Sequence, residues 1–169
     1  FGSVPGLERI QALCDKLGNP EQKLSVIHVA GTNGKGSSVA MLSSILQASG
    51  YRVGTYTSPH LERYNERFLI NGQEITNDDF AKEITLMKKI CEELRAEGKD
   101  VPTLFEIVTG AAFHYFAAQE VDILILEVGL GGKYDATNIV SSPLLSLIMS
   151  ISIDHTDFLG NSIEKIAAE

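Results

Sequence analysis

Residues 31–37 read Gly-Thr-Asn-Gly-Lys-Gly-Ser, a composition typical of a loop that binds nucleotide phosphates. The loop stands between an apolar run at 24–30, expected to be a strand, and a helix-like run at 38–49. In a strand–turn–helix unit, backbone N–H groups and the helix dipole attract an anion, and Lys35 adds positive charge near the outer phosphates. A plain flexible turn with a solvated lysine is the alternative, and the flanking strand and helix favour phosphate binding.

The loop departs at two positions from the usual G-x-x-x-x-G-K-S/T pattern. Val29 stands at the first glycine position, and Gly36 follows Lys35, where a metal-binding Ser or Thr is usual. Because few families with a phosphate-binding loop share these two differences, they are more informative about the family than a complete match would be.

Candidate ligands for a metal–nucleotide complex follow the other apolar runs. Thr-Ser-Pro-His at 57–60 follows the run at 51–56, Glu127 follows 123–126, and Asp154, His155 and Asp157 follow 144–153. Ligands of an open parallel sheet bind beyond the carboxyl ends of its strands, so these side chains are expected to converge on the phosphate turn. Together their hydroxyl, carboxylate and imidazole groups would suit a Mg²⁺–nucleotide site.

Each candidate also has a plainer interpretation. A lone acid at a strand end is commonly solvated, but the glycine-rich run at 129–132 favours metal binding by Glu127. A histidine at a strand end is commonly structural, but the two flanking aspartates favour a ligand role for His155. The glycine-rich run is not a dinucleotide fingerprint, because Tyr134 stands at the third glycine position.

The order of the apolar patterns predicts the fold class. Strands alternate with helices, which favours an α/β fold with a largely parallel sheet, flanking helices and no second domain within the chain. Further helices are expected at 7–17, 80–94 and 104–118, the second capped at Thr76 or Asn77. The runs at 121–126 and 144–153 are expected to be strands buried on both faces. His28 in a strand and His114 on a helix are expected to be structural.

Composition excludes several classes of protein. With 169 residues and 44% apolar residues the chain can form an ordinary globular core. A net charge of −8 disfavours nucleic-acid binding. No apolar run has transmembrane length and no signal peptide is visible, so no membrane partner and a cytoplasmic location are expected. Cys14 and Cys91 are expected to be reduced and partly buried. The absence of an initiator methionine and the helix-like residues at the end favour a piece of a longer protein.

Five motifs in order resemble the folylpolyglutamate synthase/dihydrofolate synthase family of the Mur ligase superfamily. They are the loop at 31–37, Thr-Ser-Pro-His-Leu at 57–61, Leu-Glu-Val-Gly-Leu-Gly-Gly at 126–132, Asp-Ala-Thr-Asn at 135–138 and Asp-His-Thr at 154–156. The resemblance covers essentially the whole chain, and Gly36 is itself a marker, since Mur ligases proper usually carry Thr there. It implies a P-loop NTPase-like domain of the Mur ligase central type, with residues 1–169 as an incomplete N-terminal ATP-binding domain and the C-terminal ligase domain absent.

The resemblance also implies an activity and its cofactors. ATP would phosphorylate a carboxylate of folate or dihydropteroate, and the amine of L-glutamate would attack the resulting acyl phosphate to form an amide. An anionic carboxylate must then approach an anionic phosphate, so positive charge from Lys35 and Mg²⁺ is needed between them. The enzyme is expected to be a monomer.

Particular residues receive roles only through this resemblance. Nucleotide binding falls to Gly31, Thr32, Asn33, Gly34, Lys35, Gly36, Ser37 and Ser38. Ser58 and Glu127 would bind one Mg²⁺, with Ser58 supplying the hydroxyl that is missing after Lys35. Glu127 and His155 would hold a second Mg²⁺. Lys35, Glu127 and His155 would be the catalytic residues. Thr103, Phe105 and Asp135 would line a pterin pocket, near a mobile loop at 59–67. Glu169 matches the glutamate of a Glu-Lys pair whose carbamylated lysine would come next.

Three other interpretations remain at this point. A cell-wall Mur ligase would share the phosphate chemistry, although Gly36 and the motif at 57–61 count against it. A nucleotide-binding switch or regulatory module is the second, but no switch-type motif is visible. The third is a fragment without activity of its own, and the 169-residue piece is expected to catalyse nothing.

Overall fold

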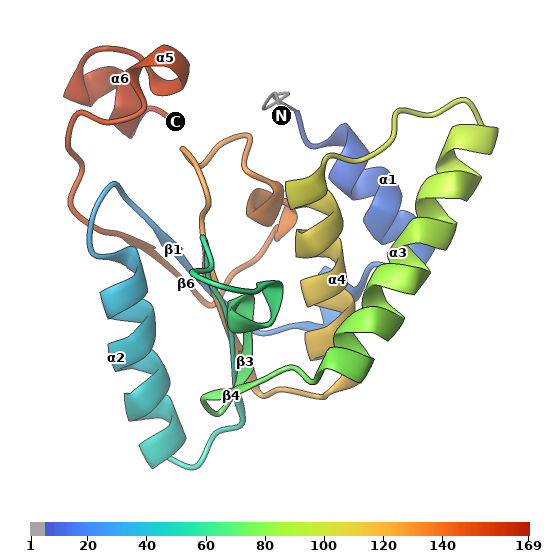
Figure 1. Cartoon of the computed structure of the whole chain (residues 1–169). Coiled ribbons are helices and arrows are strands. Elements are labelled where there is room, and N and C mark those ends of the chain that lie inside the picture. Colours follow the sequence, from blue (N-terminus) through green and yellow to red (C-terminus); the bar gives the residue numbers. More distant parts are fainter. Residues whose placement is uncertain (1–5) are drawn as a thin grey trace.

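The computed structural model describes residues 6–169 and has an α/β architecture (Figure 1). Its helices are α1 (Glu8–Leu17), α2 (Lys35–Ala48), α3 (Asn77–Ala96), α4 (Leu104–Ala118), α5 (Thr156–Leu159) and α6 (Ile163–Ala167). Its strands are β1 (Val26–Ala30), β2 (Val53–Tyr56), β3 (Phe68–Ile70), β4 (Gln73–Glu74), β5 (Ile123–Glu127) and β6 (Leu145–Ile148). Three 3-10 helices complete the order: η1 (Pro20–Lys23), η2 (Tyr64–Arg67) and η3 (Ala136–Ile139).

The strands form one six-stranded sheet in the order β4-β3-β2-β5-β1-β6. Strands β2, β5, β1 and β6 are parallel, and β3 and β4 add an antiparallel hairpin at one edge. In the register, Val29 pairs with Glu127 and Tyr56 with Leu126. The carboxyl ends of the three central strands therefore meet at one edge of the sheet. The predicted fold class is confirmed.

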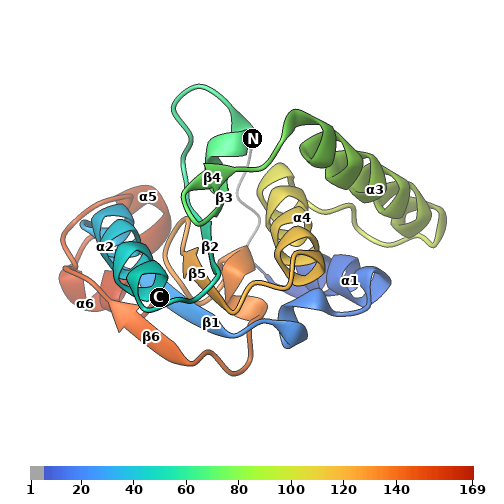
Figure 2. The same ribbon diagram turned by 90° about the horizontal axis from the view of Figure 1, so that it is seen from below.

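Helices cover the sheet unequally. Figure 2 shows α2 on one face, with α1, α3 and α4 on the other. The larger core lies on the side of α4, where Phe113 and Phe116 pack with Tyr56, Phe68 and apolar residues of β5. A smaller cluster joins α2 to the sheet and contains Ile27, Val29, Val39, Val53 and Ile125. The aromatic-rich core on the α4 side and the aliphatic cluster under α2 together hold the strands that carry the site in place.

The helix starts follow from capping chemistry. The Thr76 side chain accepts a hydrogen bond from the Asp79 amide at the start of α3, so the predicted cap is confirmed. Thr103 caps α4 in the same way, and the Glu106 carboxylate bonds back to the Thr103 amide. The prediction of a helix at 104–118 matches the observed bounds.

Helix α2 starts earlier than the sequence pattern indicates. The prediction placed its start at residue 38, whereas the helix begins at Lys35. Gly34 adopts the left-handed conformation with φ of 84°, which lets the chain turn directly into the helix. Lys35, Gly36 and Ser37 therefore belong to the first helical turn.

The prediction for residues 144–153 is wrong in two respects. The strand is short, Leu145–Ile148, and it lies at the sheet edge with largely exposed side chains. Ile148 is 71% exposed, so this strand is not buried on both faces. The apolar composition was a correct strand signal, but burial depends on a neighbouring layer, and within residues 6–169 little covers β6. After Ile148 the chain leaves the sheet to bond to the phosphate loop.

Both cysteines are free and buried, as predicted. Burial raises the pKa of the Cys14 thiol, and nearby Glu21 adds to this rise, so the thiol is unreactive. None of the helices within residues 6–169 is both long and apolar enough to cross a membrane.

Candidate active site

The phosphate loop is anchored to the segment that follows β6. The amides of Thr32 and Asn33 both donate to the Ser150 carbonyl, at 2.9 and 3.3 Å. The Thr32 hydroxyl donates to the Ser152 carbonyl and accepts from the Ser152 amide, each at 3.1 Å. The amides of Thr32 and Asn33 are thus already hydrogen-bonded and hold the loop against this segment. The amides of the first turn of α2, which no side chain caps, are left to bind an anion if one is present.

Gly31 lets the loop approach this segment closely. Its φ is 130°, and a Cβ atom at this position would lie 2.9 Å from the Met149 Cβ. A larger residue would therefore push apart the two segments that hold the loop.

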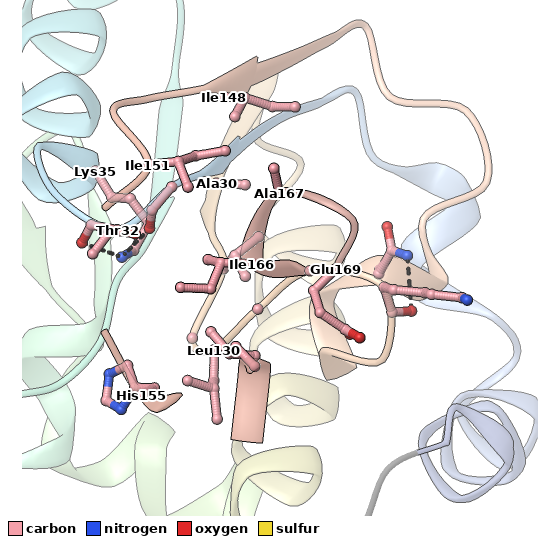
Figure 3. A pocket seen from close by; sticks show the side chains of 18 of the residues that line it. Ala30, Thr32, Lys35, Leu130, Ile148, Ile151, His155, Ile166, Ala167 and Glu169 are labelled. Carbon is pink, nitrogen blue, oxygen red and sulfur yellow. Dashed lines mark hydrogen bonds between the residues drawn. The ribbon is translucent and has the colours of Figure 1, made fainter. Parts of the chain in front are cut away.

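Lys35 points back over the loop. Its Nζ donates to the Gly31 carbonyl at 2.7 Å and to the Thr32 carbonyl at 3.4 Å (Figure 3). These bonds hold the ammonium group beside the first turn of α2. The positive charge and the helix dipole coincide there, as phosphate binding requires.

Glu127 lies at the end of β5, deep beside the same loop. Only 5% of it is exposed, and its Oε2 accepts a hydrogen bond from the Ser58 amide at 3.1 Å. Its Oε1 lies 4.0 Å from the position of a Cβ on Gly36. Burial raises the pKa of this carboxyl, whereas the Ser58 amide and the positive charge of Lys35 act to lower it. A buried carboxylate with so little compensation is suited to a cation.

Ser58 follows β2 and lies beside Glu127, as predicted. Together they offer a hydroxyl and a carboxylate, the hard oxygen donors that Mg²⁺ prefers. Position 36 offers no hydroxyl, so Ser58 stands in for the Ser or Thr that usually follows the lysine. The residues present therefore fit a Mg²⁺ ion.

His155 is farther from the end of its strand than predicted, because β6 ends at Ile148 and not at residue 153. It does not follow a strand directly, because the chain first bonds to the phosphate loop, and it caps the short helix α5 with a φ of 48°. Its ring lines the same pocket as Lys35 (Figure 3), but its closest acid is Asp154, at 3.9 Å. Among residues 6–169 no three His, Cys, Asp or Glu side chains form a metal-binding group. Its role as a second metal ligand stays a prediction.

A second, larger cavity opens on the side of α4. It has a volume of about 820 Å³ and is lined mainly by apolar and aromatic groups. Thr103, Phe105 and Asp135 all line it, and so does Ser58. The structure thus brings together the three residues predicted to contact a substrate, next to a predicted metal ligand. Residues 129–132 and Leu159 line both this cavity and the pocket around Lys35.

Asp135 has a structural role that the sequence did not reveal. One carboxylate oxygen accepts from the amides of Gly129 and Leu130, at 3.1 and 3.0 Å. The other accepts from the amide and hydroxyl of Thr137, at 2.9 and 2.6 Å. The carboxylate therefore fixes the glycine-rich loop between the two pockets. Its predicted contact with a pterin remains a prediction.

Other polar contacts near the site were also missed. His28 is buried and bonds to the Thr137 hydroxyl at 2.8 Å, which is consistent with the predicted structural role, and burial lowers its pKa. His114 is structural too, through a 2.7 Å bond to Glu83. Arg9 and Glu106 form a largely buried ion pair at 2.9 Å. Their separation by 97 residues leaves no local signal in the sequence.

The fold and the phosphate loop define the class of protein. The Mur ligase middle domain family matches residues 29–169, and the chain belongs to this family. It is 49% identical to the dihydrofolate synthase/folylpolyglutamate synthase of Bacillus subtilis, over 100% of this chain and 39% of that protein.

Solved structures agree with this assignment. The folylpolyglutamate synthase of Thermotoga maritima superposes with a TM-score of 0.88 at 48% identity, covering 98% of this chain and 37% of that one. An FPGS–AMPPCP–folate complex gives a TM-score of 0.93 at 37% identity, covering 99% and 41%. The chain thus spans about 40% of the length of these three proteins.

Proposed function

We propose that the chain is the N-terminal, nucleotide-binding part of an ATP-dependent ligase that adds L-glutamate to folate or dihydropteroate. The observation that carries this proposal is the adjacency of two pockets. The phosphate loop with Lys35 lines one, Phe105 and Asp135 line the other, and residues 129–132 form a wall of both. A carboxylate carried by a flat, apolar ligand could reach a phosphate at this junction. The similar proteins named above support the same assignment.

The residues of this chain act first on the nucleotide. The amides of the first turn of α2 bind phosphate oxygens, and the ammonium group of Lys35 exchanges its loop carbonyls for the outer phosphates. This exchange places a positive charge where the acceptor carboxylate and the transferred phosphate repel each other. Neutralising that repulsion favours attack of the carboxylate oxygen on the phosphorus, with ADP leaving, and an acyl phosphate results. The glutamate amine then displaces phosphate and forms the amide.

Ser58 and Glu127 hold Mg²⁺ in this proposal. Bound there, the ion would supply positive charge to the phosphates and to the developing transition state. Glu127 is positioned for this by β5 and by the Ser58 amide. His155 would contribute to a second ion.

Location and partners follow the same proposal. The enzyme would act as a monomer in the cytoplasm, where the two buried thiols stay reduced. Since the chain spans 39% of the Bacillus relative, residues 1–169 alone are expected to bind nucleotide without ligation. A cell-wall ligase is the alternative, to be separated by offering UDP-muramoyl peptides in place of folates.

The decisive experiment measures ATP-dependent incorporation of labelled L-glutamate by the full-length protein, with dihydropteroate and tetrahydrofolate as acceptors. Lys35→Ala should lower kcat by about 10²- to 10³-fold with both acceptors, because one charge that stabilises the transition state is lost. Lys82→Ala, which removes an exposed lysine paired with Asp79 on α3, is the matched control. Full activity of Lys35→Ala with either acceptor would show that the phosphate loop has been misassigned.

A further inference from the structure

Arg67 at the end of η2 lies at the wall of the apolar cavity. Its side chain is half-buried, and its Nε donates a hydrogen bond to the Nδ1 of His60 at 2.9 Å. The guanidinium carbon lies 5.3 Å from the centre of the Tyr64 ring, which also lines the cavity. The guanidinium group also hydrogen-bonds to the buried Tyr56 hydroxyl, so a ring, an imidazole and a hydroxyl hold it in place rather than an acid.

The charges around the cavity leave Arg67 without a counter-ion. It is the one Lys, Arg or His among the described residues that line this cavity. Of the lining acids, Glu106 pairs with Arg9, and Asp135 accepts bonds from the glycine-rich loop and Thr137. The third acid, Glu169, also lines the cavity, and within residues 6–169 it forms no ion pair with Arg67 or with any other residue.

The acid next to Arg67 in sequence is also occupied. The carboxylate of Glu66 accepts the amides of Leu61, Glu62 and Arg63, at 2.7 to 2.8 Å. None of the ion pairs formed within residues 6–169 includes Arg67. Removing a guanidinium group partly from water without an acidic partner costs desolvation free energy, which a bound anion would offset.

We propose that Arg67 binds the carboxylate of the acceptor, an elongated aromatic acid, in the apolar cavity. The Nε of Arg67 is taken by His60 and one further N–H by the Tyr56 hydroxyl, which leaves N–H groups on the terminal edge of the fork for a ligand. That edge matches the two oxygens of a carboxylate, which a lysine cannot match. Arg67 is then a specificity-determining residue that separates acids from neutral pterins. The inference rests on the proposed function.

The backbone of Arg67 lies close to the predicted metal ligands. Its carbonyl accepts from the Thr57 amide at 3.2 Å, so it stands beside the end of β2 that carries Ser58. The Ser58 amide in turn bonds to Glu127, next to the phosphate loop. Arg67 and Ser58 line the same cavity, so a carboxylate bound by Arg67 would lie in the cavity that Ser58 connects to the phosphate loop. There the guanidinium group also offsets the repulsion between the carboxylate and the phosphates.

The test compares two ligands on three forms of the full-length protein. Binding of dihydropteroate and of its decarboxylated anilinomethyl counterpart is measured by calorimetry with AMPPCP present. The wild type, Arg67→Ala and Arg63→Ala are compared. Arg63 is the matched control, since it precedes η2 but is 59% exposed and pairs with Glu74 at 2.8 Å. Arg67→Ala should weaken dihydropteroate binding by about 10- to 100-fold, leaving the neutral ligand and AMPPCP unaffected. Arg63→Ala should match the wild type for both ligands.

Each other outcome overturns the inference. Equal losses for both ligands would assign Arg67 a structural role, and no loss for either would exclude it from binding. If Arg67→Ala does not fold, Arg67→Lys is measured instead. A preference of Arg67→Lys for the acid equal to that of the wild type contradicts recognition by the guanidinium fork. Ligase activity in the wild type separates the two hypotheses: without it the proposed function fails, whereas with it only the role of Arg67 is at stake.

Discussion

Two glycine-rich loops follow neighbouring parallel strands and use their amides in opposite ways. The loop at 31–37 follows β1, and the loop at 129–135 follows β5. In the second loop the amides of Gly129 and Leu130 bind a carboxylate that belongs to the protein itself, that of Asp135. In the first, Thr32 and Asn33 bond to the chain after β6, and the first turn of α2 is left without a side-chain cap.

The comparison shows what makes a glycine-rich loop a binding site. Both loops bring N–H groups together at the edge of a sheet, which is the arrangement that attracts an anion. A loop that contains its own acid satisfies those groups and becomes a rigid wall. A loop anchored through other peptide groups keeps its helix amides for a ligand. Glycine content alone does not separate the two.

Removing the internal acid is the most severe way to test this comparison. Asp135→Ala leaves the part-buried amides of Gly129 and Leu130 and the buried amide of Thr137 without their acceptor. Since each hydrogen bond to a charged group contributes about 1.5–3 kcal/mol, unfolding free energy should fall by about 3 kcal/mol or more. Urea denaturation measures the change. Asp154→Ala, at an exposed carboxylate, is the control. A loss below about 1 kcal/mol would mean that Asp135 does not hold its loop together.

A single methyl group tests the anchoring of the phosphate loop. Gly31→Ala places a Cβ 2.9 Å from the Met149 Cβ, at a φ of 130°. We expect a loss of about 2 kcal/mol in unfolding free energy, from steric overlap and backbone strain.

Gly36→Ala is the matched control for this variant. A Cβ there lies 4.0 Å from Glu127, its nearest neighbour, and the residue is helical. Its stability should stay the same or rise by about 0.5 kcal/mol. Equal effects of the two substitutions in the same denaturation series would show that Gly31 does not anchor the loop.

The smallest expected effect is a gain in stability at the metal site. Burial raises the pKa of Glu127, so the folded state loses stability as pH rises from the unfolded to the folded pKa. Glu127→Gln removes that cost, and its melting temperature at pH 7 should exceed that of the wild type by about 2 °C. The difference should disappear below about pH 4, where both states of the wild type are protonated.

Added Mg²⁺ provides the matched measurement on these two proteins. It should raise the melting temperature of the wild type and not that of Glu127→Gln, because the ion stabilises only a protein that binds it. A Mg²⁺ effect of equal size in both proteins would remove Glu127 from the metal site.

Much of the fold could be predicted from the sequence because its signals are local. The caps at Thr76 and Thr103, the apolar stripe of α3 and the apolar runs of β1 and β5 each depend on neighbouring residues. The exposure of β6 was not predictable in this way. Its burial depends on the layer beside it, and a run of apolar residues does not reveal whether that layer exists.

For the site, the motifs and their order were enough to predict which strand ends carry the polar side chains. Lys35, Ser58 and Glu127 lie together because parallel strands end at one edge, which the motif order already implied. Which charged groups are satisfied depends on the folded chain. Within residues 6–169 no ion pair includes Arg67, whereas Asp135 is fully hydrogen-bonded. The partners of Asp135 lie within six residues of it, but only the folded loop brings them to its carboxylate. Motifs specify residue types locally, whereas hydrogen-bond and ion-pair satisfaction is a property of the folded chain.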